Sequence, residues 1–147
     1  MTTANILGNL FPSVSDIPEK YRLDAQVEPI APSYKISQLC IEENPKVVVG
    51  DFVDGVQTLL RQHHIDSRLY AVPVPASCEY RLQYTAIRSW DFTAYLSDAS
   101  LRLYKGDQQI GYVKYNLTNN GGLSLSKFGS VEEKMAPLIN QLLGQAK

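Results

Sequence analysis

The sequence lacks long apolar runs, an excess of basic residues and the common motifs of nucleotide, metal and nucleophile chemistry. No apolar stretch reaches the 18 or more residues that a membrane-spanning helix needs. Lysine and arginine number 14 against 15 aspartate and glutamate, so no broad basic field attracts phosphates and we expect no nucleic-acid partner. A Gly-x-Ser-x-Gly elbow, a Walker loop, a dinucleotide fingerprint and a cysteine-rich zinc pattern are all missing. We therefore expect no cofactor, no metal site and no catalytic residue.

Cysteine is also scarce, because the chain has only Cys40 and Cys78. In a cytosolic protein the expectation is two buried thiols, whereas in an exported protein a disulfide is the better hypothesis. Residues 1–5 contain no basic residue and no long apolar stretch, so they do not form an intact signal peptide. The residues themselves therefore leave both compartments, and both states of the cysteines, open.

The remaining composition is typical of one globular domain with an extension before it. Hydrophobic residues make up 44% and charged residues 20% of the 147 residues, an ordinary globular balance. Residues 1–33 hold four of the eight prolines and show no sustained periodicity. Because proline restricts itself and the residue before it, we predict a mostly irregular arm over residues 1–33. A single α+β domain is predicted over residues 34–147.

The first half of this domain predicts a strand, a helix and a second strand. Residues 34–42 are predicted to form the first strand, and Asn44 followed by Pro45 then suits an N-cap and a first helical residue. A helix over residues 45–63 follows from apolar side chains at helical spacing. These side chains are Val49, Phe52, Val53, Val56, Leu59, Leu60 and His63. A short strand is predicted at residues 67–72.

Alternating side chains dominate the second half of the domain. From Tyr80, apolar and polar residues alternate with the period of two that a half-buried strand shows. A bend or bulge is predicted at residues 89–91, where this alternation stops. Residues 97–104 and 109–117 flank a Lys-Gly-Asp-Gln turn and predict a hairpin.

A turn, a short strand and a second helix are predicted after that hairpin. Residues 119–122 predict the turn and residues 123–128 the strand. Ser130 and Glu133 have the spacing of a capping box and begin an amphipathic helix, in which Pro137 predicts a kink or a break. The predicted order is β-α-β-β-β-β-(β)-α. This order favours an α+β fold with a mainly antiparallel sheet of four to six strands and both helices on one face.

A pair of adjacent histidines, His63 and His64, is the first candidate for chemistry. Adjacent residues point in different directions on a helix, so the two side chains do not readily share one metal ion. A structural or capping role suits His63, because a cation is favourable near a helix end. The alternative function is an unrecognised hydrolase of an envelope substrate, which would use one of these histidines with an aspartate in a cleft.

A second candidate segment holds Arg88, the only tryptophan Trp90, Asp91 and Tyr95. One interpretation places Trp90 in the core while Arg88 and Asp91 pair locally. The other interpretation makes these four residues a recognition patch, because Trp, Tyr and Arg dominate interface hot spots. The nine tyrosines of the chain also permit a sheet face that binds a peptide or a glycan.

Several runs of residues resemble a known family when they are taken in order. They are Ser-Cys-Glu-Tyr-Arg-Leu-Gln-Tyr-Thr-Ala at 77–86, Arg-Ser-Trp-Asp-Phe at 88–92, Tyr-Leu-Ser-Asp-Ala at 95–99 and Gly-Gly-Leu-Ser-Leu-Ser-Lys-Phe at 121–128. Together they are similar to a family of small, functionally uncharacterised lipoproteins of Gram-negative bacteria. The resemblance extends over residues 36–143.

The resemblance implies export to the envelope, an N-terminal lipid anchor, a periplasmic domain and a disulfide between Cys40 and Cys78. The lipid-bearing cysteine and signal peptide of that family are not found in this sequence. We therefore expect membrane contact only through an anchor outside these residues, with the arm as a spacer. The resulting hypothesis is a non-enzymatic accessory or binding domain whose partner is an envelope protein or a cell-wall component.

Overall fold

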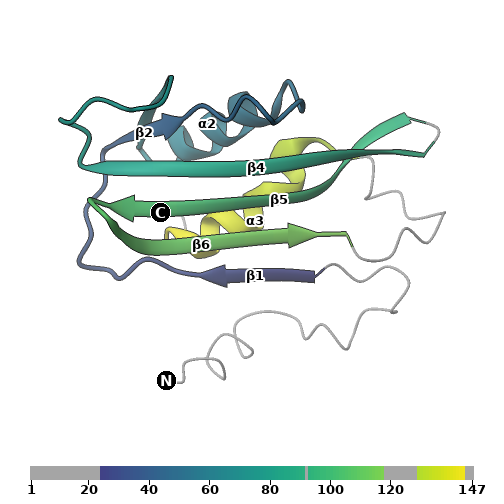
Figure 1. The fold of residues 1–147 in the computed structure, drawn as a ribbon. Helices are drawn as coiled ribbons and strands as arrows, with labels where there is room; N and C mark the ends of the chain where they lie inside the picture. Colours follow the sequence, from purple (N-terminus) through teal and green to yellow (C-terminus); the bar gives the residue numbers. More distant parts are fainter. Residues whose placement is uncertain (1–23, 92, 118–128, 145–147) are drawn as a thin grey trace.

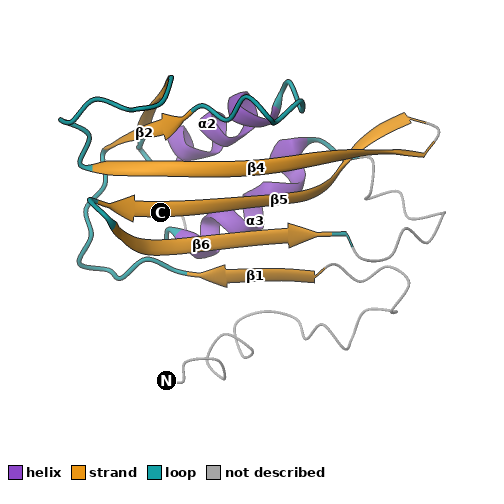
Figure 2. Cartoon of the chain, viewed as in Figure 1, coloured by secondary structure: helices purple, strands orange, loops and turns teal. Residues whose placement is uncertain are grey.

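A computed structural model describes residues 24–91, 93–117 and 129–144 of the chain. These residues form one sheet of six strands and two helices (Figures 1 and 2). The elements are β1 Asp24–Glu28, β2 Gln38–Glu42, α2 Phe52–Gln62, β3 Asp66–Tyr70, β4 Tyr80–Asp91, β5 Thr93–Lys105, β6 Gln108–Asn116 and α3 Val131–Leu142. The predicted α+β class, with four to six strands and two helices, is thus confirmed.

The sheet is mixed and has the strand order β1-β6-β5-β4-β2-β3. The strands from β4 through β5 and β6 to β1 pair antiparallel, whereas β2 lies parallel to both β3 and β4. Parallel neighbours need a crossover connection, and α2 supplies it between β2 and β3. Both helices lie on the same side of the sheet (Figure 2). Neither helix in the described ranges has the length and apolar character to span a membrane.

Part of the segment predicted as an irregular arm is an edge strand, β1. It pairs antiparallel with β6 along its whole length. The sequence did not reveal this strand because a short edge strand needs hydrogen bonds on one side only, and its pattern is too brief to show periodicity. Pro29 follows directly after the strand, where its missing N–H disturbs no ladder bond. Residues 1–23 of the predicted arm lie outside the described residues.

Helix α2 begins at Phe52 and not at Pro45, where the sequence predicted its start. Asn44 fixes a turn instead, because its side-chain oxygen accepts a hydrogen bond from the Lys46 amide at 3.0 Å. The same side chain donates to the Tyr84 carbonyl at 3.0 Å, which holds the turn against β4. The apolar stripe of the helix is nevertheless confirmed. Its buried residues are Phe52, Gly55, Val56, Leu59 and Leu60.

Strands β4 and β5 form a longer hairpin than the sequence predicted. β4 runs without a break through residues 89–91, and β5 begins at Thr93, four residues before the predicted Ser97. The expected irregularity lies earlier, as a register shift between Ile87 and Arg88. The far ends of β4 and β5 consequently project past the neighbouring strands (Figure 1).

Helix α3 begins with the predicted capping box. The Glu133 amide donates to Ser130 Oγ at 3.0 Å, and the Ser130 amide donates to Glu133 Oε1 at 2.8 Å. The helix continues through Pro137 to Leu142, so the break that was one of two alternatives does not occur. The carbonyl that loses its helical donor belongs to Glu133, an exposed residue. The turn and strand predicted at residues 119–128 lie outside the described residues.

The core lies between the sheet and the helix layer. Its largest fully buried side chains are Phe52, Ile41, Leu101, Leu103, Met135, Ile139, Val56 and Val113. The two helices approach each other closely at Gly55, where a Cβ would lie 2.8 Å from Cγ1 of Val131. This approach explains why α2 keeps a glycine, although glycine costs a helix about 1 kcal/mol relative to alanine.

Candidate functional site

The uncovered face of the sheet carries two arginine–tyrosine pairs. Arg81 of β4 lies opposite Tyr104 of β5, and Arg102 of β5 lies opposite Tyr112 of β6. The guanidinium carbon lies 5.0 Å from the ring centre in the first pair and 4.6 Å in the second. Such cross-strand pairs stabilise a sheet and restrict the side chains that form them.

Glu42 at the end of β2 neutralises the first of these arginines. Its carboxylate accepts hydrogen bonds from Arg81 Nη1 at 2.5 Å and from Gln83 Nε2 at 3.1 Å. Arg81 Nη2 also donates to the carbonyl of Gly106 at 2.6 Å. The charge of Arg81 is therefore neutralised by an ion pair within the protein. This ion pair and the accompanying hydrogen bonds hold the ends of β2, β4 and β5 together.

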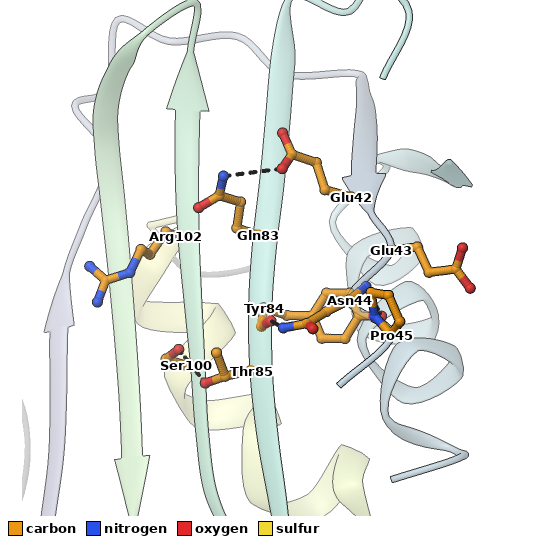
Figure 3. A pocket seen from close by; sticks show the side chains of 9 residues that line it. All are labelled: Glu42, Glu43, Asn44, Pro45, Gln83, Tyr84, Thr85, Ser100 and Arg102. Carbon is orange, nitrogen blue, oxygen red and sulfur yellow. Dashed lines mark hydrogen bonds between the residues drawn. The ribbon is translucent and has the colours of Figure 1, made fainter. Parts of the chain in front are cut away.

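A hollow of about 210 Å³ opens beside Arg102, next to the turn that follows β2 (Figure 3). Its lining residues are Glu42, Glu43, Asn44, Pro45, Gln83, Tyr84, Thr85, Ser100 and Arg102. The hydroxyls of Thr85 and Ser100 lie 2.6 Å apart. Arg102 points away from Glu42 in Figure 3, and it forms no ion pair within the described ranges. This mixture of hydroxyl, amide and guanidinium groups suits the polar groups of a glycan or a peptide.

The two histidines do not contribute to this hollow. His63 Nε2 lies 2.8 Å from Oδ1 of Asn140 in a contact between the end of α2 and α3, and His64 is exposed. None of the ion pairs between described residues includes a histidine. Those residues also contain no cluster of three His, Cys, Asp or Glu side chains suited to a metal. The described part of the chain thus offers the hydrolase hypothesis no histidine–carboxylate pair.

Trp90 lies near the tip of the projecting hairpin and not in the core. Its side chain is 75% exposed, that of Ile87 is 56% exposed, and Arg88 is exposed as well. The interpretation that Trp90 fills the core is therefore wrong. The physical reason is the length of the hairpin: the alternation that buries Ala86 continues past the region that the helices cover (Figure 1). Asp91 is the last residue of β4.

Tyr95 lies opposite Ser89 on the same hairpin, beside a buried lysine. Lys134 of α3 is 8% exposed, and its ammonium nitrogen lies 5.5 Å from the Tyr95 ring centre and 5.9 Å from that of Tyr115. It donates to the Leu96 carbonyl at 2.9 Å, and the Tyr115 hydroxyl donates to the same carbonyl at 3.3 Å. Burial lowers the pKa of Lys134 to about 8. Burial, with the nearby Tyr95, raises the pKa of Tyr115 to about 12.

The structure therefore divides the predicted recognition patch. Arg88 and Trp90 are exposed on the hairpin, whereas Tyr95, which pairs with the intervening Ser89, is partly buried and contacts Lys134. Sequence reasoning missed two further features, the hollow beside Arg102 and the buried Lys134. The position of Arg102 on the uncovered face could have been predicted, because Arg102 alternates with buried leucines in β5 and must face away from the core. Lys134 gave no such signal, since lysine is almost never fully buried.

Cys40 and Cys78 form a disulfide whose Cα atoms lie 6.1 Å apart. The bond joins β2 to the segment that precedes β4, and it confirms the predicted pairing. The alternative of two reduced thiols does not agree with this structure. Disulfides of this kind persist in oxidising compartments.

Comparisons with known proteins show the fold and no family. No protein-family model matches the chain, and no curated protein matches it. Among solved structures, the chain is similar to the PelC L103M dodecamer from Paraburkholderia phytofirmans, with a TM-score of 0.54 and 12% sequence identity, over 84% of this chain and 99% of that one. A second PelC dodecamer from the same organism gives a TM-score of 0.49 and 11% identity, over 79% of this chain and 96% of that one. At this identity the first likeness shows a shared fold.

Proposed function

We propose that this chain is a non-enzymatic accessory or binding domain of the bacterial cell envelope, periplasmic and lipid-anchored in its native precursor. The observation that carries the proposal is the exposed Trp90 beside Arg88 on a projecting hairpin. Tryptophan and arginine contribute most to binding energy at protein interfaces. A large aromatic side chain on a paired two-stranded ribbon is suited to enter a pocket of a partner, because little conformational freedom is lost on binding.

Two observations support the location in the envelope. The disulfide between Cys40 and Cys78 suits an oxidising compartment. The ordered runs between residues 77 and 128 resemble those of envelope lipoproteins. The coding sequence upstream of Met1 tests the anchor: a signal peptide ending in a lipid-accepting cysteine supports it, and an upstream region without one contradicts it.

We infer that the partner is an envelope protein or a cell-wall component. The hollow beside Arg102 is a second contact surface, and its polar lining of amide, hydroxyl and charged groups suits a cell-wall glycan. Sedimentation with purified peptidoglycan tests this contact. We expect co-sedimentation of the wild-type chain and its loss in Arg102→Ala, whereas equal behaviour of the two proteins assigns partner binding to the hairpin alone.

Photo-cross-linking in intact cells tests the hairpin directly. A photoreactive phenylalanine derivative at Ile87, which is 56% exposed, is expected to form an adduct with one envelope component. The adduct should disappear in Trp90→Ala while the melting temperature stays the same. The same derivative at the exposed Arg61 of α2 is the matched control. An adduct that forms equally well in Trp90→Ala would contradict the proposal.

A further inference from the structure

The outer edge of β4 has no strand beside it beyond the point where β2 ends. The pairing between β2 and β4 includes only Arg81 and Leu82 of β4, whereas β4 continues to Asp91. Over the rest of its length the described residues give β4 one neighbouring strand, β5 (Figure 1). Half of the main-chain N–H and C=O groups in this part of β4 therefore point toward an open edge.

Two hydrogen bonds show which residues of β4 face each side. The Ile87 carbonyl accepts from Ser97 Oγ on the β5 side. The Tyr84 carbonyl accepts from Asn44 Nδ2 on the side of β2. Because main-chain groups of successive residues point to opposite sides of a strand, the even-numbered residues of β4 present their N–H and C=O groups to the open edge.

Arg88 and Trp90 are the exposed even-numbered residues of this edge. Among the described residues, no main-chain hydrogen bond outside the sheet ladder reaches either residue, and the ladder partners of both lie in β5, on the opposite side of the strand. Donors and acceptors repeated every second residue match the main chain of another extended segment. The side chains of both residues lie on one face of β4, and the exposed Ile87 lies on the other. The edge therefore combines unpaired main-chain groups, an aromatic ring and a cation.

We propose that an extended acidic segment of a partner polypeptide adds to β4 as a further strand, with an acidic side chain opposite Arg88 and an apolar side chain opposite Trp90. This inference rests on the proposed binding role of the hairpin and specifies the chemistry of its partner. The acidic residue follows from charge, since Arg88 is exposed and forms no ion pair with any described residue. Opposite charges directly across two strands stabilise their pairing.

A second copy of the chain is a poorer occupant of this edge. An antiparallel pairing centred on Arg88 would place two arginines directly opposite each other, which is unfavourable. The exposed edge of each hairpin is also short.

Fluorescence of Trp90 tests the proposal, because it is the only tryptophan in the chain. The probe is the peptide Thr-Val-Thr-Glu-Thr-Val-Thr, in which valine stands two residues from the glutamate on both sides. The pattern is therefore the same for parallel and antiparallel addition. We expect a saturable blue shift of the emission, and binding about tenfold weaker for the same peptide with lysine in place of glutamate.

Two variants of Arg88 separate the contribution of its main-chain N–H to peptide binding from that of its side chain. Arg88→Ala keeps the edge N–H, and we expect it to bind both peptides with equal affinity. Arg88→Pro removes an N–H that β5 does not use, and we expect it to bind neither peptide while it still unfolds cooperatively on heating. Arg61→Ala on α2 is the matched control and should keep the preference for the glutamate peptide.

A chemical version of the experiment leaves the protein unchanged, in case Arg88→Pro does not fold. Two glutamate peptides are N-methylated at the odd or at the even positions. An added strand uses the N–H groups of one side only, so one methylated peptide should bind and the other should not. Equal behaviour of the two methylated peptides overturns strand addition.

The remaining outcomes also decide the question. Equal affinity of the wild-type chain for the glutamate and lysine peptides, or peptide binding by Arg88→Pro, overturns the proposal. An emission shift that grows with protein concentration alone and is absent in Arg88→Pro overturns it in favour of a second copy. A cross-link from position 87 that persists in Arg88→Pro but is lost in Trp90→Ala overturns strand addition and leaves the proposed binding function standing.

Discussion

Replacing Lys134 by methionine is predicted to stabilise the domain at neutral pH. The lysine is 8% exposed, and burial lowers its pKa from 10.5 to about 8. A shift of this size corresponds to about 3 kcal/mol against the charged form. The rings of Tyr95 and Tyr115 offset about 0.5–2 kcal/mol of this cost. Removing the charge should therefore raise the free energy of unfolding by on the order of 1–2 kcal/mol.

The hydrogen bond that Lys134 donates to the Leu96 carbonyl does not reverse this expectation. Its acceptor, the Leu96 carbonyl, keeps a second donor in the Tyr115 hydroxyl at 3.3 Å. The carbonyl is therefore not left buried and unsatisfied when the ammonium is removed, which would otherwise cost about 1–3 kcal/mol. Methionine is similar in length to lysine and fills irregular apolar space well.

The effect should depend on pH in a defined direction. Below pH 8 Lys134 is charged in the folded and unfolded states, so the full cost of burying its charge acts on the wild type. Between pH 8 and 10.5 the folded protein releases the proton first, and that cost fades as pH rises. The advantage of Lys134→Met is thus largest near pH 7 and small near pH 10. Tyr115, with a pKa raised to about 12, destabilises the fold as pH rises above 10 in both proteins and cancels from the difference.

Thermal unfolding of both proteins between pH 7 and pH 10 measures this difference. We expect the melting temperature of Lys134→Met to exceed that of the wild type by about 3–6 °C at pH 7. Lys46→Met, at an exposed lysine, is the control and should show no such trend. A Lys134→Met protein that is less stable than the wild type by the same amount at pH 7 and pH 10 would refute the reasoning.

Three further substitutions test the packing. Replacing Cys40 and Cys78 by serine opens a connection with a sequence separation of 38; the free energy of unfolding in urea should fall by up to about 4 kcal/mol, and an unchanged midpoint would contradict this. Ser130→Ala removes the cap of α3 and should cost about 1 kcal/mol, while Ser130→Gly should cost less. Gly55→Ala places a Cβ 2.8 Å from Val131 and should cost about 1–3 kcal/mol, an expectation that a stabilised variant would overturn.

The features predicted correctly from the sequence are those with a local pattern. The stripe of α2 repeats over three turns, and the strand from Tyr80 alternates over many residues, so each pattern is long enough to identify its period. The cap of α3 needs only Ser130 and Glu133 at one spacing. The disulfide was predicted from a resemblance, because the separation of two cysteines does not show that their geometry permits a bond.

The features that were wrong or missed depend on distant parts of the chain. β1 forms because it can pair with the edge of β6. Residues 24–28 contain no pattern that predicts this pairing. Tryptophan is a large apolar residue suited to a core, yet the exposure of Trp90 depends on how far the helices extend along the hairpin. Lys134 is buried because β5 supplies the Leu96 carbonyl and the Tyr95 ring beside it, and β6 supplies the Tyr115 ring. These relations arise from packing and leave no periodic signal.

The Trp90→Ala protein tests the central claim most directly, when its stability and its partner binding are measured together. Truncating a tryptophan in a core costs about 3–5 kcal/mol, whereas changes at exposed sites usually stay within about 0.5 kcal/mol. Because Trp90 is 75% exposed, we predict an almost unchanged melting temperature and the loss of the cross-link from position 87. An unfolded or strongly destabilised protein, or one that keeps the cross-link, would contradict a recognition role for this hairpin.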